Sequence, residues 1–193
     1  GTRKSARSAL RSFYGWLVDC GTIPESPAER LPRIRTPRGR PKPTPDALYR
    51  AALAASDERV RLAVRLAGQC GLRRAEMSRT AREDVVATEL GHCLRVVGKG
   101  AHVRLVPLPD DLASQILARP PGWLFPSPYG EGDGHLTPHY LGGLITAALG
   151  HEATTHTLRH RAATVAYRGT RDLRAVQELL GHSRPETTAG YVA

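Results

Sequence analysis

A proline-rich segment divides this chain of 193 residues into two unequal parts. Five prolines stand among basic residues, at positions 32, 37, 41, 43 and 45. Proline fixes φ and has no backbone N–H, so prolines at this density exclude both a helix and a sheet ladder. We therefore expect an extended linker over residues 31–43. The length leaves room for one ordinary domain after it, residues 44–193, and for only a fragment of another before it, residues 1–30.

The fragment before the linker carries an apolar stripe with helical spacing. Its members recur at steps of three and four over residues 3–20, and they are Ala6, Leu10, Phe13, Leu17 and Cys20. One helix cannot bury its own apolar face, so this fragment needs packing partners from elsewhere. The chain also begins without Met, which suggests a cut or tagged protein.

The charge is strongly positive and uneven. The formal net charge is +10, and residues 1–43 supply +7 of it, with ten Arg and Lys against three acidic residues. A polyanion such as nucleic acid is the natural partner, through phosphate contacts and counterion release. From charge alone, a basic protein without such a partner is the alternative.

Several classes of protein are disfavoured by composition. Cys20, Cys70 and Cys93 are odd in number, far apart and form no CxxC pair, which argues for a reducing compartment and hence the cytoplasm. No apolar run approaches the ~18 residues of a membrane span. No signal peptide opens the chain, and no glycine-rich phosphate loop indicates a nucleotide cofactor.

Residues 44–193 show signals of both helix and strand. Thr44 and Pro45 offer an N-cap and a first-turn proline for one helix, and a second is expected over about 57–69, starting near Ser56. After about residue 136 we expect four short helices, near 137–149, 155–168, 171–180 and 184–191.

A β-hairpin is expected over residues 92–107. Two runs in which apolar residues alternate with others flank Gly98-Lys99-Gly100, and their apolar members are Leu94, Val96, Val103 and Leu105. The glycines mark the turn, so Lys99 is predicted at or near the hairpin tip.

Five short strings follow one another in this second part. They read Gly-Leu-Arg73-Arg-Ala-Glu76, Val-Gly-Lys99-Gly, His156-Thr-Leu-Arg159-His, Leu-Gly-His182-Ser and Thr-Thr-Ala-Gly-Tyr191. In this order they resemble the catalytic domain of the tyrosine recombinases, the phage integrase family, over about residues 44–193. The resemblance implies an α+β fold, mainly helical with a small antiparallel sheet or hairpin.

The same resemblance assigns the first part of the chain. It implies that residues 1–30 end a helical core-binding domain and that the linker, residues 31–43, runs along DNA backbone. A plain basic spacer is the alternative for the linker. The residues expected to contact DNA are Arg3, Lys4, Arg7, Arg11, Arg33, Arg35, Arg38, Arg40 and Lys42.

Arg73 and Arg159 are the expected phosphate clamp. A guanidinium offers a planar fork of donors that matches phosphate oxygens and stays charged at any relevant pH. Two of them would stabilise the charge that develops on a pentacoordinate phosphorane. Glu76, three residues after Arg73, is expected to hold Arg73 or a neighbour by a charged hydrogen bond.

Lys99 is distinguished by its rarity. The chain has 25 Arg and only three Lys, so it uses Arg wherever positive charge suffices. A Lys between two glycines suggests a need for a cation that can give up a proton, which Arg does poorly. We expect Lys99 to act as the general acid toward the departing 5′ oxygen. A turn lysine that favours solubility is the alternative.

Three histidines accompany the clamp. His156 and Arg159 are three residues apart and should project from one helix face. The resemblance implies that His156 hydrogen-bonds the scissile phosphate and assists as a base, and that His182, after the helix-ending Gly181, contacts a non-bridging oxygen. His156 and His160 have metal-pair spacing, but Thr157 replaces the Glu of a zinc-protease helix. No metal is expected, and His160 is interpreted as structural.

Tyr191 is the expected nucleophile. Ser183 and Glu186 have capping-box spacing, so a short helix should present Tyr191 about two turns later. A phenol with a pKa near 10 is a weak nucleophile until nearby cations and a base favour its ionisation. Tyr191 alone among the six tyrosines closely follows the His182 string.

The sequence therefore predicts a site-specific recombinase, most like a phage or mobile-element integrase. It would cleave and rejoin double-stranded DNA through a 3′-phosphotyrosine, without a cofactor, as a homotetramer in the synaptic complex. Accessory DNA-bending or directionality proteins are possible partners, a membrane is not, and a cytoplasmic, nucleoid-associated location is expected. A type IB topoisomerase and an inactive DNA-binding relative are the alternatives.

Overall fold

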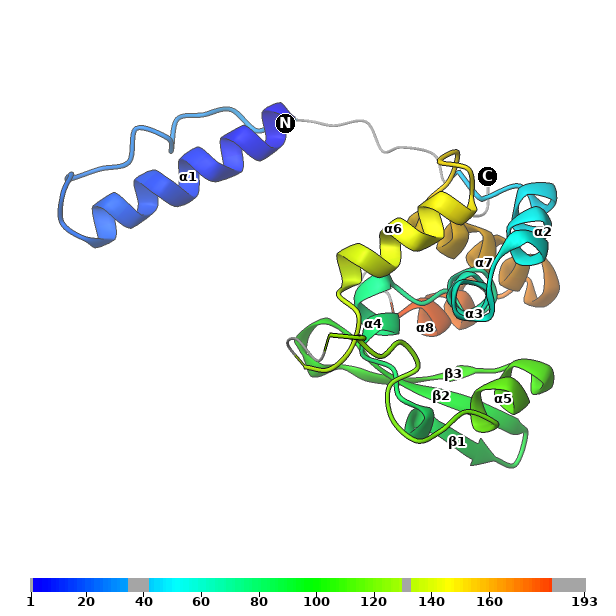
Figure 1. Cartoon of the computed structure of the whole chain (residues 1–193). Coiled ribbons are helices and arrows are strands. Elements are labelled where there is room, and N and C mark those ends of the chain that lie inside the picture. The colour runs from blue at the N-terminus through cyan, green and yellow to red at the C-terminus, as the bar shows by residue number, and fades with distance from the viewer. Residues whose placement is uncertain (1, 35–41, 130–132, 182–193) are drawn as a thin grey trace. The chain divides into compact units, whose positions relative to one another are not determined.

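The computed structural model describes residues 2–34, 42–129 and 133–181 (Figure 1). Contacts between Cα atoms divide the chain into two units, residues 1–39 and 40–193. The finer division into a core-binding fragment, a linker and a catalytic domain stays a prediction.

The first unit contains one long helix, α1 (Arg3–Asp19), as predicted. The Oγ1 atom of Thr2 accepts a hydrogen bond from the Ser5 backbone N–H and so caps its first turn. None of its residues is buried, and Phe13 and Trp16 are more than half exposed. Within the described residues of this unit, the apolar stripe therefore stays uncovered.

Two of the arginines predicted to contact DNA bind the chain itself. The Arg7 guanidinium donates twice to the Leu31 carbonyl, and Arg11 donates to the carbonyls of Ala28 and Glu29. These bonds hold the segment after α1 along the helix. Arg7 and Arg11 thus have an intramolecular role in this unit.

The second unit is mixed α and β, as predicted. Its helices are α2 (Asp46–Ala55), α3 (Glu58–Gly68), α4 (Arg74–Ser78), α5 (Asp110–Leu117), α6 (Pro138–Ala148), α7 (Thr155–Thr170) and α8 (Leu173–Leu180). Its strands are β1 (Val85–Thr88), β2 (Gly91–Val97) and β3 (Val103–Pro107), with short 3₁₀ turns at Arg82–Asp84 and Lys99–Ala101. The helix expected near 184–191 lies outside the described residues.

The predicted hairpin is confirmed as β2 and β3, and β1 extends it to an antiparallel sheet in the order β1-β2-β3. Leu94 pairs with Val106, and Val96 pairs with Arg104. The inward face of β3 is therefore Arg104 and Val106, whereas the apolar Val103 and Leu105 are exposed. Successive side chains of a strand point to opposite faces, so the apolar alternation that predicted the hairpin lies on the exposed face of β3.

The helix predicted over about 57–69 is confirmed as α3, where Asp57 is the N-cap and accepts a hydrogen bond from the Val60 N–H. The predicted N-cap of α2 is wrong by one residue, because Pro45, not Thr44, holds that position. Thr44 is buried instead, because its hydroxyl and its backbone N–H both bind Thr157 on α7. This contact joins the start of the second unit to the helix that carries His156.

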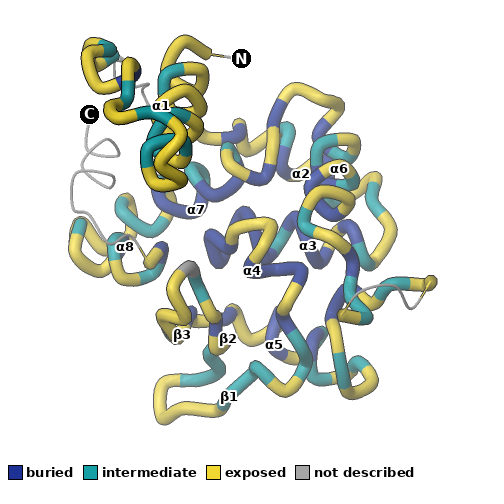
Figure 2. Tube along the Cα trace, turned by 90° about the vertical axis from the view of Figure 1, so that its left-hand side faces the viewer, coloured by how far each residue is buried: buried dark blue, intermediate teal, exposed yellow. Residues whose placement is uncertain are grey.

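The core surrounds α3, whose Leu62 and Leu66 are fully buried. Figure 2 shows buried residues concentrated along α3, α4 and the first half of α7. The Arg161 guanidinium, on α7, lies 3.9 Å from the centroid of the Tyr49 ring and donates to the Gly68 carbonyl. This stacked cation fixes α7 against α2 and α3. Among the described residues, no helix is long and apolar enough to cross a membrane.

Truncation of Leu62 should destabilise the second unit. Leu62→Ala leaves a cavity in the centre of the core and is expected to cost about 2–5 kcal/mol in the free energy of unfolding. Leu90→Ala, at a fully exposed leucine in the β1–β2 turn, should change it by less than about 0.5 kcal/mol. Urea unfolding monitored by circular dichroism compares the two variants, and equal losses would contradict the central position of α3.

Candidate active site

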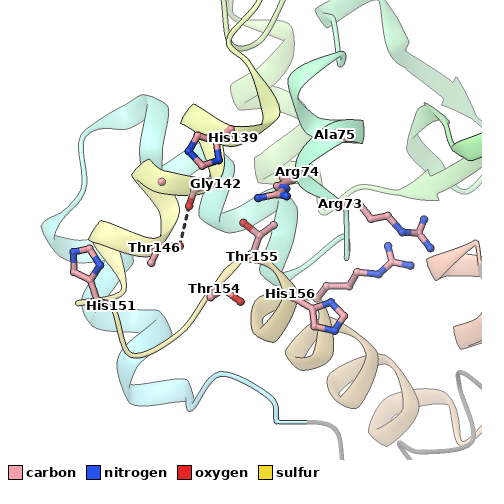
Figure 3. Close-up of a pocket in the computed structure, with 12 residues that line it drawn as sticks. Arg73, Arg74, Ala75, His139, Gly142, Thr146, His151, Thr154, Thr155 and His156 are labelled. Atoms are coloured by element: carbon pink, nitrogen blue, oxygen red, sulfur yellow. Dashed lines mark hydrogen bonds between the residues drawn. The ribbon is translucent and has the colours of Figure 1, made fainter. Parts of the chain in front are cut away.

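A pocket of about 680 Å³ opens between α4, α6 and α7. Four of the residues that line it carry the chemistry predicted from the sequence or stand next to it: Arg73, Arg74, His156 and Arg159. Figure 3 shows Arg73 and His156 extending toward the same side of the pocket, from the start of α4 and the first turn of α7. The predicted clamp and the predicted base thus meet in space, although 83 positions separate them in the chain.

The two clamp arginines are positioned by one turn. Gly71 has a φ of +67°, a left-handed conformation that L side chains rarely adopt, and an added Cβ would lie 2.7 Å from Leu180 Cδ2. The Gly71 carbonyl accepts a hydrogen bond from Arg159 Nη1, and the Leu180 carbonyl accepts one from Nη2. Arg73, two residues after Gly71, is the N-cap of α4. The Gly-Leu-Arg string thus places both arginines.

Glu76 holds Arg73 as predicted. Its Oε1 accepts a hydrogen bond from Arg73 Nη1 at 2.7 Å, and its Oε2 accepts one from the Arg73 backbone N–H at 2.8 Å. The Arg159 guanidinium lies 3.9 Å from Oε2. Burial alone would raise the pKa of the Glu76 carboxyl, but hydrogen bonds from Arg104 and Arg73 offset this and lower it. Glu76 is therefore a buried carboxylate that stays ionised.

Arg104, on β3, is a member of this cluster that the sequence did not reveal. Its Nη1 and Nη2 donate to the two oxygens of Glu76 at 3.0 and 2.9 Å, and its Nε donates to the Leu179 carbonyl at 3.0 Å. The signal was present in part, because Arg104 is polar within an apolar strand and lies five residues after Lys99. Its pairing with Glu76 depends on the sheet register, which the sequence did not fix.

The hairpin turn reaches the same cluster. A Cβ added to Gly98 would lie 3.6 Å from Arg104 Nη1 and 3.7 Å from Glu76 Oε1. The backbone immediately before Lys99 is therefore next to Glu76, and Lys99 begins the short turn between β2 and β3. This agrees with the predicted position of Lys99 near the hairpin tip.

His156 and His160 form a hydrogen-bonded pair on α7. Their Nε2 atoms are 2.9 Å apart and their rings meet edge to face. Burial, followed by the charges of Arg159 and Arg73, lowers the pKa of His156. Burial, followed by His156 and Arg159, lowers the pKa of His160 to about 4. Both imidazoles are thus neutral at pH 7, one donating to the other, which suits His156 to accept a proton.

Arg74 and α6 form another part of the pocket wall. Arg74 lies beside α6, where a Cβ on Gly142 would come within 3.3 Å of the Arg74 Cδ atom. His139 and Thr155 complete this wall (Figure 3). In the described part of the chain, no group of three or more His, Cys, Asp or Glu could hold a metal ion.

Several predicted residues lie outside the described chain. They are His182, Tyr191, Arg35, Arg38 and Arg40. The turn that precedes His182 is described, and Gly181 ends α8 in the left-handed conformation that the sequence predicted. Of the other DNA-contact candidates, Arg3, Lys4, Arg33 and Lys42 are exposed.

The model of the phage integrase family matches residues 45–193 of this chain. The chain belongs to the phage integrase family. The tyrosine recombinase XerD of Pseudomonas aeruginosa is 34% identical to this family member over 216 residues, which cover 98% of the chain and 70% of that protein. XerC of Myxococcus xanthus is 31% identical over the same shares of the two proteins.

Solved structures of the phage integrase family share the fold. The integrase from mycobacterium phage Brujita matches with a TM-score of 0.66 and 25% identity, over 99% of this chain and 66% of that one. A lambda integrase dimer bound to a COC′ core site has a TM-score of 0.71 at 19% identity, over 98% of this chain and 58% of that one. The chain thus covers about two thirds of the length of the first of these two structures and less of the second.

Membership confirms the predicted family and the α+β recombinase fold. The relatives are tyrosine recombinases, enzymes of DNA recombination, so the chain is a tyrosine recombinase. Neither a type IB topoisomerase nor an inactive DNA-binding relative is favoured by these relatives.

Acidification should destabilise the second unit through His160. The pKa of this imidazole is near 6.5 in the unfolded chain and about 4 in the fold. The unfolded state therefore takes up the proton first, and stability present above pH 6.5 is lost as the pH falls toward 4. In His160→Gln this loss is absent, so its Tm should fall less over that range in calorimetry. Parallel Tm curves for variant and wild type would contradict the assignment.

Proposed function

We propose that this chain cleaves and rejoins double-stranded DNA at a specific site through a 3′-phosphotyrosine at Tyr191. The phenolic oxygen attacks the scissile phosphorus, the bond to the 5′ oxygen breaks, and a 5′-hydroxyl leaves. The 5′-hydroxyl of a partner strand then reverses the step. The observation that carries this proposal is the meeting of Arg73, Arg159 and His156 at one pocket, with the ionised Glu76 beside the two arginines.

Arg73 and Arg159 would bind the phosphate differently. Arg159 is buried and held by two backbone carbonyls, so its guanidinium has a fixed place. The side chain of Arg73 is 43% exposed, and Glu76 holds only one edge of its guanidinium closely. A fixed donor and an accessible donor suit a charge that grows on the non-bridging oxygens during the reaction. His182 is the further donor proposed for such an oxygen.

His156 and Lys99 would move the two protons. The proton of Tyr191 passes to His156, which is neutral and partly exposed at the pocket. Lys99 gives a proton to the departing 5′ oxygen as its bond to phosphorus breaks. The position of the hairpin turn beside Glu76 supports this role.

The reaction exchanges one phosphodiester for another ester of similar energy. The bond energy is kept in the phosphotyrosine, so no nucleotide is consumed and the proposal includes no cofactor. The positive charge that a metal would supply comes from arginine side chains. No step requires electron transfer.

The partners are proposed from the solved relatives. One is a lambda integrase tetramer bound to a Holliday junction, and another is a XerH recombinase bound to its difH substrate. We infer that residues 1–30 and the linker 31–43 bind the DNA site in addition to the catalytic domain, 44–193. We also infer that the chain acts as a homotetramer on two duplexes. Accessory bending or directionality proteins and a cytoplasmic, nucleoid-associated location belong to the same proposal.

Replacement of the nucleophile should abolish the covalent adduct. Tyr191→Phe removes the attacking oxygen, so the variant should bind DNA but form no adduct with nicked suicide duplexes. Tyr140→Phe, at an exposed tyrosine of α6, should react like the wild type. Denaturing gel electrophoresis detects the adduct, and sequencing of the trapped DNA identifies the site. An adduct in Tyr191→Phe would disprove the assignment.

Replacement of Lys99 should slow cleavage, and a substrate whose leaving group needs no proton should restore the rate. Lys99→Ala removes the proton donor, so we expect a loss on the order of 10²–10⁴ in the single-turnover rate. A 5′-bridging sulfur leaves as a thiolate without a proton, so it should restore most of that rate. Arg95→Ala, at an exposed arginine of β2 that pairs with Asp84, is the control and should keep the wild-type rate. No rescue by sulfur would mean that Lys99 is not the acid.

A further inference from the structure

Arg104 is a largely buried and extensively hydrogen-bonded side chain near the proposed site. It reaches from β3 and donates three hydrogen bonds, two to the Glu76 carboxylate and one to the Leu179 carbonyl at the end of α8. Only 13% of its side chain is exposed, compared with 43% for Arg73. Arg104 does not line the pocket, and all three nitrogens of its guanidinium donate to the protein, so its role must come from what it binds.

The first group that Arg104 binds is the Glu76 carboxylate, whose hydrogen-bond acceptor positions are all occupied. Glu76 accepts four hydrogen bonds, two from Arg73 and two from Arg104, and an ionised carboxylate offers about four acceptor positions. The bidentate geometry with Arg104 is the strongest form of this pairing. Arg104 therefore supplies half of the bonds that satisfy the buried charge.

The second thing it binds is the turn that leads to His182. The Arg104 side chain lies so close to Gly181 that an added Cβ would be 3.0 Å from Arg104 Cδ and 3.1 Å from Nη1. Glycine is the only residue without a Cβ, and Gly181 also has a left-handed φ of +61°. The end of α8 is thus fitted against Arg104.

We propose that Arg104 is a positioning residue for strand cleavage: it neutralises Glu76, so that the carboxylate does not compete with the DNA phosphate for Arg73, and it ties the Lys99 hairpin to the end of α8. This inference rests on the proposed function. Three arginines and one glutamate give this cluster a formal charge of +2, and loss of Arg104 would halve it.

Single-turnover cleavage across pH separates this role from a merely structural one. The substrate is a suicide duplex carrying the sequence recovered from the wild-type adduct. Arg104→Met keeps a long unbranched side chain but removes the two hydrogen bonds from Arg104 to Glu76. The carboxylate then keeps only its hydrogen bonds from Arg73. At pH 7.5 we expect cleavage to slow by about 10- to 100-fold, since each ~1.4 kcal/mol lost is tenfold, while the Kd for the duplex changes less than about threefold.

The pH profile is the decisive readout. Without Arg104, the buried Glu76 loses two hydrogen bonds and takes up a proton at higher pH, which removes the competing charge. The rate of Arg104→Met relative to wild type should therefore rise as the pH falls from 7.5 to 5. In the double variant Glu76→Gln with Arg104→Met, the competing charge is absent, so its relative rate should exceed that of Arg104→Met at pH 7.5 and show no such rise.

The matched control is Arg95→Met. Arg95 lies on the adjacent strand β2 and pairs with Asp84 at 2.7 Å, away from the pocket. It should keep the wild-type rate at every pH. If Arg104→Met fails to fold, Arg104→Lys carries the test, because its ammonium keeps the positive charge but cannot make the bidentate pair with Glu76, and a smaller rise toward acid pH is expected.

The possible results distinguish failure of the positioning role from failure of the proposed function. A relative rate of the Arg104 variant that does not change with pH, or a loss of duplex affinity as large as the loss of rate, would overturn the positioning role. A wild-type chain that forms no adduct would instead count against the proposed function. An acid rise in the Arg104 variant but not in the double variant supports the inference.

Discussion

The Glu76 carboxylate is the interaction on which the site depends. Glu76 and Arg159 are the only charged residues that are buried in the described part of the chain. A buried charge is costly unless it is paired and hydrogen-bonded, and breaking such a pair costs several kcal/mol. Glu76 meets this requirement with arginines from three elements: the start of α4, strand β3 and helix α7. The same requirement therefore keeps the sheet, the clamp and the histidine helix together.

Two glycines explain why the site is formed at helix ends. Gly71 and Gly181 are both left-handed, and an added Cβ would lie 2.7 Å from Leu180 Cδ2 at the first and 3.0 Å from Arg104 Cδ at the second. The Gly71 carbonyl and that of Leu180, the residue before Gly181, accept the hydrogen bonds of Arg159. The glycines of the Gly-Leu-Arg and Leu-Gly-His strings thus do no chemistry. They let two chain reversals approach closely enough to hold one guanidinium between them.

The sequence predicted what depends on short-range signals. Helical spacing gave α1, glycine punctuation gave the hairpin, and the i,i+3 spacing put His156 and Arg159 on one pocket wall. Features set by pairing between distant segments were missed. Strand β1 is four residues long and half exposed, so it carries little pattern. Arg104 lies between the exposed Val103 and Leu105, and its inward position follows from the pairing of β3 with β2. Thr44 bonds to α7, not to its own helix.

The histidine pair and the arginines together give the proposed base a dependence on substrate. Burial, with the charges of Arg159 and Arg73, keeps His156 neutral but also makes it a weak proton acceptor. A phosphodiester bound between the two arginines would offset their charge, and the opposing effect on the imidazole would shrink. The affinity of His156 for the tyrosine proton should then rise only when DNA occupies the pocket. The proposed donor, Lys99, lies on a separate hairpin, so in this proposal the donor and the acceptor would reach the same phosphate from different elements.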